Sequence, residues 1–380
     1  MAGRFDPLTR TTSRGGHVAV PAGRRSPTQP PAGHSPTQAG APQPPAGHSP
    51  TQAGAPQPPA GHAPTQVGPP QPPAPKRREW TPPAPLDLGL TLGPLRRGPS
   101  DPTFKVTPDG SVWRATLTPA GPATLRVVAV SGAGRVEAEA WGPGADWVLD
   151  SLPALLGAED DAAGFTPRHR LVHASHRRRP GLRLTRTGLV LESLIPVILE
   201  QKVTVEEAYR AWRRLVRQYG EPAPGPAPGP TADLYVMPAP ATWRRIPSWD
   251  WHAAGVDAKR SGTILRAARV APRLEEAAAM APADAARRLE LVPGIGPWTS
   301  AETLQRSNGA PDAVTTGDLH LPGIIGFALA GNPDADDAEM LELLAPYAGH
   351  RHRAARLILL TGRTPPRRTP RMPRGDIGRL

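Results

Sequence analysis

Two glycines separated by one residue and followed by a proline give residues 291–299 (Leu-Val-Pro-Gly-Ile-Gly-Pro-Trp-Thr) the composition of a tight turn before a helix. Gly294 and Gly296 allow backbone conformations that other residues avoid. Pro297 suits the first helical position, where the amide that proline lacks would have no partner. Backbone amides at such a helix start bind phosphate oxygens, assisted by the helix dipole. An ordinary connection between two helices would use the same residues, so the turn alone leaves both interpretations open.

A carboxylate at Asp318 is the second candidate, because it follows Gly317 and comes directly before another helical pattern. As a cap, Asp318 would accept hydrogen bonds from the first amides of that helix, a role worth about 1 kcal/mol. A carboxylate held in a groove also stabilises positive charge that develops on a substrate. The two roles do not exclude each other.

Residues 291–299 resemble the hairpin of the helix-hairpin-helix DNA glycosylase superfamily. The likeness continues into residues 312–321 (Asp-Ala-Val-Thr-Thr-Gly-Asp-Leu-His-Leu), which are similar to that superfamily's Gly/Pro-rich loop ending in an aspartate. Residues 190–204 (Val-Leu-Glu-Ser-Leu-Ile-Pro-Val-Ile-Leu-Glu-Gln-Lys-Val-Thr) are similar to a helix of the DNA-3-methyladenine glycosylase II branch. The resemblance covers residues 188–360, and a thinner likeness covers 86–157, where that branch carries a sheet domain.

The resemblance implies that Asp318 is the catalytic carboxylate of a monofunctional DNA base-excision glycosylase. Such an enzyme flips a damaged base out of duplex DNA and hydrolyses its N-glycosidic bond, which leaves an abasic site. The carboxylate would stabilise an oxocarbenium-like sugar and help to orient or deprotonate the attacking water. We expect an alkylated purine, best matched by alkylated adenine, as the base.

Trp298 occupies the position at which bifunctional relatives place a Schiff-base lysine, and tryptophan cannot be that nucleophile. Its indole is predicted to stack on the extruded base, since an aromatic face attracts a cationic alkylated purine. A large core side chain beside the hairpin is the alternative. Glu302 and Leu319 complete the expected base pocket, although Glu302 departs from the aromatic residue that the family can carry there, and an exposed helix charge would explain it more simply.

Lys202 is a second departure, because it stands where the family's apolar wedge fills the gap left by the flipped nucleotide. Lysine reaches a phosphate or the gap but stacks poorly. The DNA-binding residues implied by the resemblance are Gln201, Lys202, Val292, Gly294, Ile295, Gly296 and Thr299.

Cofactor needs are expected to be minimal. The resemblance implies that the backbone carbonyls of Glu290, Val292 and Gly294 hold a monovalent cation. The sequence has no cysteine, so the iron–sulfur cluster of some superfamily members is not expected in its usual form.

Two rival functions remain open. A noncatalytic DNA-binding protein would keep the hairpin and lose the pocket, which the unusual Lys202 and Glu302 favour and the Gly317-Asp318 pair opposes. A glycosylase for oxidised or deaminated bases is the second rival.

The predicted fold class is α+β, a mostly helical helix-hairpin-helix core preceded by a small sheet-plus-helix domain and a disordered arm. Alternating apolar residues predict strands over 111–118 and 123–130, and Thr204 with Glu207 predicts a helix capping box. The expected organisation is a disordered Pro/Gly-rich repeat arm (1–79), an α+β domain (80–160), an Arg-rich connector (161–187), the glycosylase domain (188–362) and a basic tail (363–380).

A formal net charge of +12 over 380 residues predicts a polyanionic partner. Damaged double-stranded DNA is the leading candidate, and an anionic membrane is the runner-up. Residues 168–186 contain seven arginines and no acid, which predicts added nonspecific affinity for the DNA backbone. Without a signal peptide or a membrane-spanning stretch in the sequence, we expect a cytoplasmic, nucleoid-associated monomer.

Overall fold

The computed structural model describes residues 74–366, apart from 131, 133 and 227–228. Most of the arm expected over 1–79, and the basic tail from residue 367 onward, therefore lie outside the described residues. Strand β1 (Lys76–Trp80) falls inside the span that was predicted as arm. Its sequence, Lys-Arg-Arg-Glu-Trp, is dominated by charge, which is typical of an edge strand that avoids pairing with other chains. Because these residues do not alternate between apolar and polar side chains, the sequence pattern did not predict the strand.

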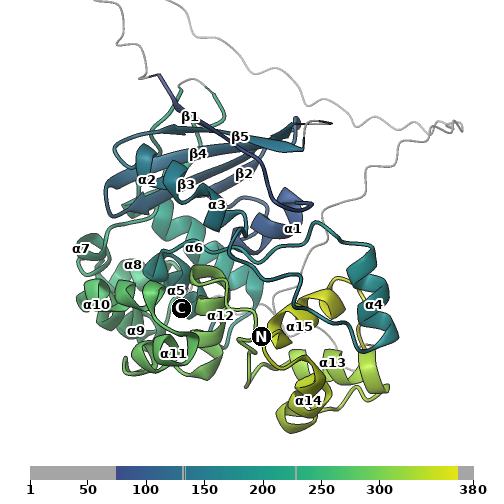
Figure 1. Ribbon diagram of the computed structural model, residues 1–380. Helices are drawn as coiled ribbons and strands as arrows, with labels where there is room; N and C mark the ends of the chain where they lie inside the picture. Colours follow the sequence, from purple (N-terminus) through teal and green to yellow (C-terminus); the bar gives the residue numbers. More distant parts are fainter. Residues whose placement is uncertain (1–73, 131, 133, 227–228, 367–380) are drawn as a thin grey trace, which may run out of the picture. The chain divides into compact units, whose positions relative to one another are not determined.

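Five antiparallel strands form one sheet in the order β1-β5-β4-β3-β2 (Figure 1). The other four strands are β2 (Phe104–Val106), β3 (Val112–Thr118), β4 (Gly121–Val130) and β5 (Arg135–Trp141). The α+β class and the two strands predicted over 111–118 and 123–130 are confirmed. The turn between β3 and β4 is closed by Gly121, whose φ of +114° suits glycine.

One face of the sheet is covered by short helices. Helix α2 (Ala145–Asp150) packs against β1, β4 and β5. Leu125 and Val127 of β4 join Val148 and Leu149 of α2 in one buried cluster. The neighbouring elements are α1 (Leu88–Leu92), the 3₁₀ turn η1 (Gly93–Leu95) and α3 (Leu152–Leu155). The sheet part thus has a hydrophobic core of its own.

Helix α5 (Val190–Leu199) is the centre of the second core, where it packs against α6, α9, α10 and α12. Every residue of α5 except Glu192 is buried, which explains its continuous apolar sequence. The surrounding elements are α6 (Val205–Tyr219), α7 (Pro240–Trp243), α8 (Ser248–Ala253), α9 (Ala258–Arg269), α10 (Ala271–Glu275), η2 (Glu276–Ala279), α11 (Pro282–Glu290) and α12 (Pro297–Ser307). The predicted capping box at Thr204 and Glu207 is confirmed at the start of α6.

A third buried cluster joins helices that are far apart in the sequence. Its elements are α4 (Arg170–Arg177), α13 (Leu321–Ala330), α14 (Asp337–Leu344), the turn η3 (Ala345–Tyr347) and α15 (Arg351–Leu359). Helix α4 lies in the span expected to be a connector (161–187). Val172 and Ser175 of α4 are buried, and the helix packs against α15. Part of the arginine-rich segment is therefore structural, because one face of α4 belongs to this core. Within the described residues, no helix is long and apolar enough to cross a bilayer.

Ion pairs connect the sheet to the helices. Glu192 of α5 accepts hydrogen bonds from Arg114 and Thr116 of β3. Arg97 Nη1 lies 2.7 Å from a carboxylate oxygen of Glu200, and both side chains are mostly buried. A small ladder of β6 (Glu221–Pro222) and β7 (Tyr235–Val236) adds a contact between β7 and β3. The two ion pairs fix the sheet part against the first turn of α5, at Glu192, and against its C-terminal end, at Glu200.

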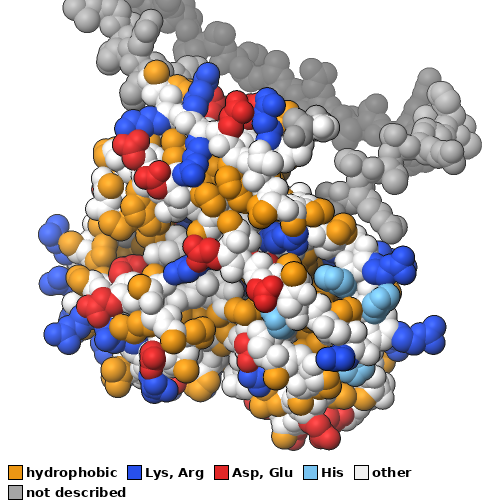
Figure 2. Space-filling model, in the orientation of Figure 1, with side chains coloured by type: hydrophobic (Ala, Val, Ile, Leu, Met, Phe, Trp, Pro, Cys, Tyr) orange, Lys and Arg blue, Asp and Glu red, His pale blue; other side chains and the backbone are white. Residues whose placement is uncertain are grey.

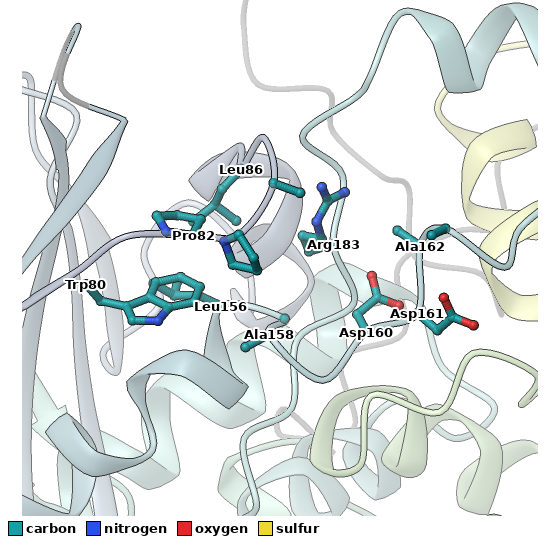
Figure 3. A pocket seen from close by; sticks show the side chains of 13 residues that line it. Trp80, Pro82, Leu86, Leu156, Ala158, Asp160, Asp161, Ala162 and Arg183 are labelled. Atoms are coloured by element: carbon teal, nitrogen blue, oxygen red, sulfur yellow. The ribbon is translucent and has the colours of Figure 1, made fainter.

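A cavity of about 150 Å³ lies where the segment around residues 80–86 meets the loop after α3 (Figure 3). Trp80 lines it from the end of β1, Pro82 and Leu86 line it from the segment that follows, and Asp160 lines it from the loop after α3. The Asp160 carboxylate accepts the Leu184 amide at 3.0 Å and forms an ion pair with Arg353 of α15. Both side chains of that pair are almost inaccessible to solvent, at 2% and 1%. The charge of Arg353 is therefore buried with Asp160 as its carboxylate partner.

We predict that Asp160→Asn lowers the free energy of unfolding by about 3–5 kcal/mol, since the buried guanidinium of Arg353 keeps its charge and loses its counter-ion. Urea-induced unfolding measures the change. Asp146→Asn is the matched control, because Asp146 pairs with Lys76 on the surface, where both side chains are more than half exposed. The control is expected to cost less than about 1 kcal/mol. Equal losses in the two variants would contradict the assignment.

Candidate active site

The loop between α11 and α12 is anchored by two apolar side chains. Val292 and Ile295 are 7% and 5% exposed, and the Ile295 amide donates to the Val292 carbonyl at 3.0 Å. Pro293 and Gly294 are exposed. Both anchors were predicted to bind DNA, and their burial leaves the backbone as the part of these residues available to a partner. The hairpin therefore has an apolar underside and an accessible main chain.

Gly294 has a conformation that requires glycine. Its φ is +99°, and an added Cβ would lie 2.2 Å from Thr263 Oγ1 of α9. Gly296 differs, because an added Cβ there meets nothing within 4 Å. Close packing of the hairpin on α9 thus explains why a glycine is required at position 294. Position 296 has room for a Cβ atom.

Side chains from two other helices hold the hairpin in place. Arg266 of α9 donates through Nε to the Pro293 carbonyl at 2.9 Å. Gln201, just beyond α5, donates through Nε2 to the Gly294 carbonyl at 3.0 Å and to Thr299 Oγ1 at 2.8 Å. Gln201 and Thr299 were both predicted to contact DNA, and the structure brings them together at the hairpin. Their contacts to DNA remain predictions.

Lys202 is exposed beside Gln201 and has a φ of +55°. Among the described residues it is the one non-glycine residue with a positive φ. For a residue with a Cβ this conformation costs on the order of 1–2 kcal/mol. Strain of this kind often accompanies a functional position, and the wedge position that the resemblance implies for Lys202 remains a prediction. The turn between α5 and α6 thus presents this side chain to solvent.

The start of α12 satisfies the geometric requirements for binding an anion. Gly296 is the N-cap and makes no side-chain capping hydrogen bond, and Pro297 follows it. The first amides of a helix have no intrahelical acceptor. With no capping oxygen at Gly296, the amides of the first turn can donate to a phosphate oxygen, which the positive end of the helix dipole also favours.

Asp318 lies close to this helix, in the loop before α13. Its Oδ2 accepts a hydrogen bond from Trp298 Nε1 at 3.0 Å, and its Oδ1 accepts from the amides of His320 and Leu321 at 2.8 and 2.9 Å. The N-cap of α13 is His320 and not Asp318, which corrects the predicted cap position, although the Asp318 carboxylate still accepts the amide of Leu321, the first residue of the helix. It is only partly buried, so it is accessible from the surface.

The hydrogen bonds to Asp318 decide its charge. Burial raises the pKa of the carboxyl, but the hydrogen bonds from Trp298, His320 and Leu321 outweigh burial and hold the pKa below its usual value. At neutral pH the group is a carboxylate. A fixed negative charge, half open to solvent, stabilises a cation placed against it.

A residue that the sequence analysis missed supports this loop. Asp337, the first residue of α14, accepts the Gly317 amide on Oδ2 at 2.7 Å. Gly317 has a φ of +76°, so the loop turns sharply immediately before Asp318. No motif connects residues 317 and 337, and only the packing of α13 on α14 brings them together.

Trp298 is half-buried at the start of α12, and its indole joins the hairpin to Asp318. The sequence predicted a ring that stacks on a base and did not predict the hydrogen bond. Leu319 lies next to Asp318 with 69% of its surface exposed. Its exposure places an apolar side chain at the surface beside the carboxylate, which is compatible with its predicted pocket role.

Glu302 forms an ion pair one turn farther along α12. Its Oε2 lies 2.7 Å from Arg306 Nη1, and its Oε1 accepts from Thr315 Oγ1 at 3.2 Å. With 18% of the side chain exposed, Glu302 is not the exposed helix charge that was considered. Because Arg306 neutralises it, Glu302 contributes little net charge to the neighbourhood of Trp298.

The carbonyls predicted to hold a monovalent cation are partly occupied by protein donors. The Val292 carbonyl accepts from the Ile295 amide, and the Gly294 carbonyl accepts from Gln201. A carbonyl oxygen has two lone pairs, so the residues still fit such an ion. Over the part of the chain that the structure describes, no group of three or more His, Asp or Glu side chains could hold a metal.

No protein-family model and no curated protein matches this sequence. Solved structures do match. The 3-methyladenine DNA glycosylase from Archaeoglobus fulgidus aligns over 75% of this chain and 97% of its own, with a TM-score of 0.60 and 18% identity. An 8-oxoguanine glycosylase/lyase from Clostridium acetobutylicum, in complex with double-stranded DNA, aligns over 74% and 92%, with a TM-score of 0.57 and 12% identity.

Replacement of the two hairpin glycines is expected to have unequal effects. Gly294→Ala should lower the free energy of unfolding by about 1–3 kcal/mol, because it combines a strained φ with a collision at Thr263. Gly296→Ala is the matched control and should change stability by less than about 0.5 kcal/mol. Urea unfolding of both variants provides the comparison, and a harmless Gly294→Ala would show that the hairpin does not need this close approach.

Trp298→Phe is expected to raise the pKa of Asp318, since phenylalanine keeps the aromatic ring and loses the N–H donor. The ionised carboxylate stabilises the fold above the carboxyl's usual pKa, and this contribution is lost as pH falls through the folded-state pKa. That contribution should therefore shrink in the variant. An NMR titration of the carboxyl measures the pKa. Trp249→Phe serves as control because Trp249 is 71% exposed, and the same pKa in both variants would refute the expectation.

Proposed function

We propose that this chain, which has the helix-hairpin-helix DNA glycosylase fold, is a monofunctional DNA glycosylase that excises damaged purines. The hydrogen bond between Trp298 Nε1 and Asp318 Oδ2 is the observation that carries the proposal. It places an ionised carboxylate beside the helix whose first amides suit a phosphate. A nucleotide bound by its backbone at the hairpin would therefore have its sugar near Asp318.

The proposed chemistry is dissociative. As the N-glycosidic bond breaks, positive charge develops on the deoxyribose, and the Asp318 carboxylate stabilises that charge. A carboxylate with a lowered pKa is a weak base, so Asp318 acts mainly through its charge and by orienting water. The base leaves with the electron pair of the N-glycosidic bond, water adds to the anomeric carbon and loses a proton to the solvent, and the product is an abasic site.

The exposed edge of the site fits an aromatic base. The partly exposed indole of Trp298 offers a face for stacking, and the exposed Leu319 adds apolar surface. A cationic alkylated purine gains an added attraction to the electron-rich indole. Because the ion pair with Arg306 neutralises Glu302, we assign the preference for a cationic base to Trp298 and Asp318. The hairpin carbonyls would hold a monovalent cation without taking part in the bond cleavage.

Hydrolysis without strand cleavage is supported by the placement of the lysines. The sequence contains Lys76, Lys105, Lys202 and Lys259 only, and Trp298 stands at the nucleophile position. Lys202, exposed beside Gln201, is the lysine adjacent to the hairpin contacts. A glycosylase/lyase needs a nucleophilic amine at the sugar, and borohydride trapping of a covalent DNA adduct that depends on Lys202 would replace the monofunctional assignment.

Asp318→Asn is expected to reduce the single-turnover rate of base excision from methylated duplex DNA by about 10²-fold or more, because the negative charge is lost. Asparagine also caps helices, so the loop should keep its structure. The measurement is the yield of heat-labile abasic sites over time. Asp146→Asn removes an exposed carboxylate elsewhere and should excise at the original rate.

A panel of duplexes, each with one defined lesion, separates the candidate functions. Release of alkylated purines alone supports the proposal, and release of oxidised or deaminated bases alone replaces the substrate class. Excision retained by a folded Asp318→Asn protein would remove the carboxylate from the mechanism. A protein that binds every duplex and excises nothing would be a DNA-binding protein.

A further inference from the structure

Helix α4 carries a continuous stripe of cationic and polar side chains. Arg170, His173, Arg177 and Arg178 are exposed, with the exposed Ala174 among them. Their spacings of three and four residues put them on one side of the helix. We name these five residues the α4 stripe. The sequence indicated an excess of positive charge in this region, and the helix places the exposed cationic side chains on one side.

The opposite side of α4 is held firmly. Ser175 Oγ donates to the Leu357 carbonyl of α15 at 2.6 Å, and Val172 is completely buried. Beyond the helix, Arg179 donates to Ser175 Oγ at 2.9 Å and to the Leu360 carbonyl at 2.5 Å. The stripe therefore cannot rotate inward, and its charges project from a rigid support.

The arginines of the stripe have no carboxylate partner among the described residues. Some other arginines have a carboxylate partner, as in Arg186 with Glu159 and Arg287 with Asp284. Figure 2 shows blue and pale-blue side chains over the α4 region. Like charges that lie close together repel one another. Binding of an anionic partner would therefore reduce the electrostatic repulsion among these side chains.

We propose that the α4 stripe is a second contact surface for the phosphates of duplex DNA, outside the hairpin. The choice of DNA as the polyanion rests on the proposed function. From Arg170 to Arg178 the helix rises about 12 Å, which matches roughly three to four phosphates of one strand at about 3.4 Å each along the axis. Helix α4 packs against α15, and α15 packs against α13, which is the helix that follows Asp318 in the sequence (Figure 1).

The residue composition of the α4 stripe argues against a membrane as its partner. Helices that bind at a bilayer surface expose an apolar face to the lipid. The apolar side of α4 is buried against α15, and Ala174 is the one apolar residue of the stripe. A charged face with little apolar area fits a phosphate backbone, which is contacted by charge.

Two charge-matched triple variants test the surface. The first carries Arg170→Gln, Arg177→Gln and Arg178→Gln in α4, and the control carries Arg213→Gln, Arg214→Gln and Arg217→Gln in α6. Binding to undamaged duplex is measured over a range of salt concentrations. The α4 variant is expected to lower the slope of log K against log salt by about 2 to 3, because each lost phosphate contact removes about 0.9. The α6 variant should lower it by less than 1.

Equal slopes for the two variants would overturn the proposal, because only net charge would then matter. Loss of binding to anionic vesicles by the α4 variant, with DNA binding unchanged, would also overturn it. The assay uses undamaged DNA and does not depend on base excision. A failure of the α4 surface is therefore distinguishable from a failure of Asp318 to act in excision.

Cross-linking supplies a second measurement that does not depend on loss of charge. The sequence has no cysteine, so Ala174→Cys introduces a single thiol in the middle of the stripe. Its thiolate should form a disulfide by exchange with a mixed disulfide tethered to a backbone phosphate of duplex DNA, and the small thiol of that mixed disulfide is released. Gln218→Cys, at an exposed position on α6, is the control. Equal cross-linking of both cysteines would overturn the proposal even if the charge variants misfold.

Discussion

The hydrogen bond from the Trp298 indole to the Asp318 carboxylate is the contact on which the site depends. It joins the first turn of α12 to the loop before α13. The indole belongs to the first turn of α12 and the carboxylate to the loop before α13, so one bond fixes the distance between a negative charge and the helix start that we propose binds phosphate. It also keeps that charge ionised, because it acts with two backbone amides against the effect of burial.

Each half of this contact has its own support. The hairpin is fixed from below by buried apolar side chains and from the sides by Gln201 and Arg266. The loop is fixed by the carboxylate of Asp337. Because the supporting groups come from α5, α9 and α14, the site is positioned by the packing of the helices. A rigid support of this kind favours preorganised electrostatic stabilisation, in which the charge is in place before the substrate reacts.

Buried ion pairs hold the parts of the molecule together, and exposed charge faces outward. The Asp160–Arg353 and Arg97–Glu200 pairs connect distant segments and have little access to solvent. The α4 stripe is the opposite case, with cationic side chains gathered and unpaired on a fixed helix. The same excess of arginine thus serves as internal structure in one place and, as we propose, as a surface for a polyanion in another.

Local signals allowed the sequence to determine the turn at Gly294 and Gly296, the capping box at Thr204 and Glu207 and the main strands, since each depends on a few neighbouring residues. The charged edge strand β1 was not predicted, because its residues do not alternate between apolar and polar. It is a strand because it pairs with β5. Only the tertiary structure decided that Trp298 donates to Asp318 and that Glu302 pairs with Arg306 beside Thr315. Such contacts depend on how helices that are distant in sequence pack together, and no short pattern encodes that packing.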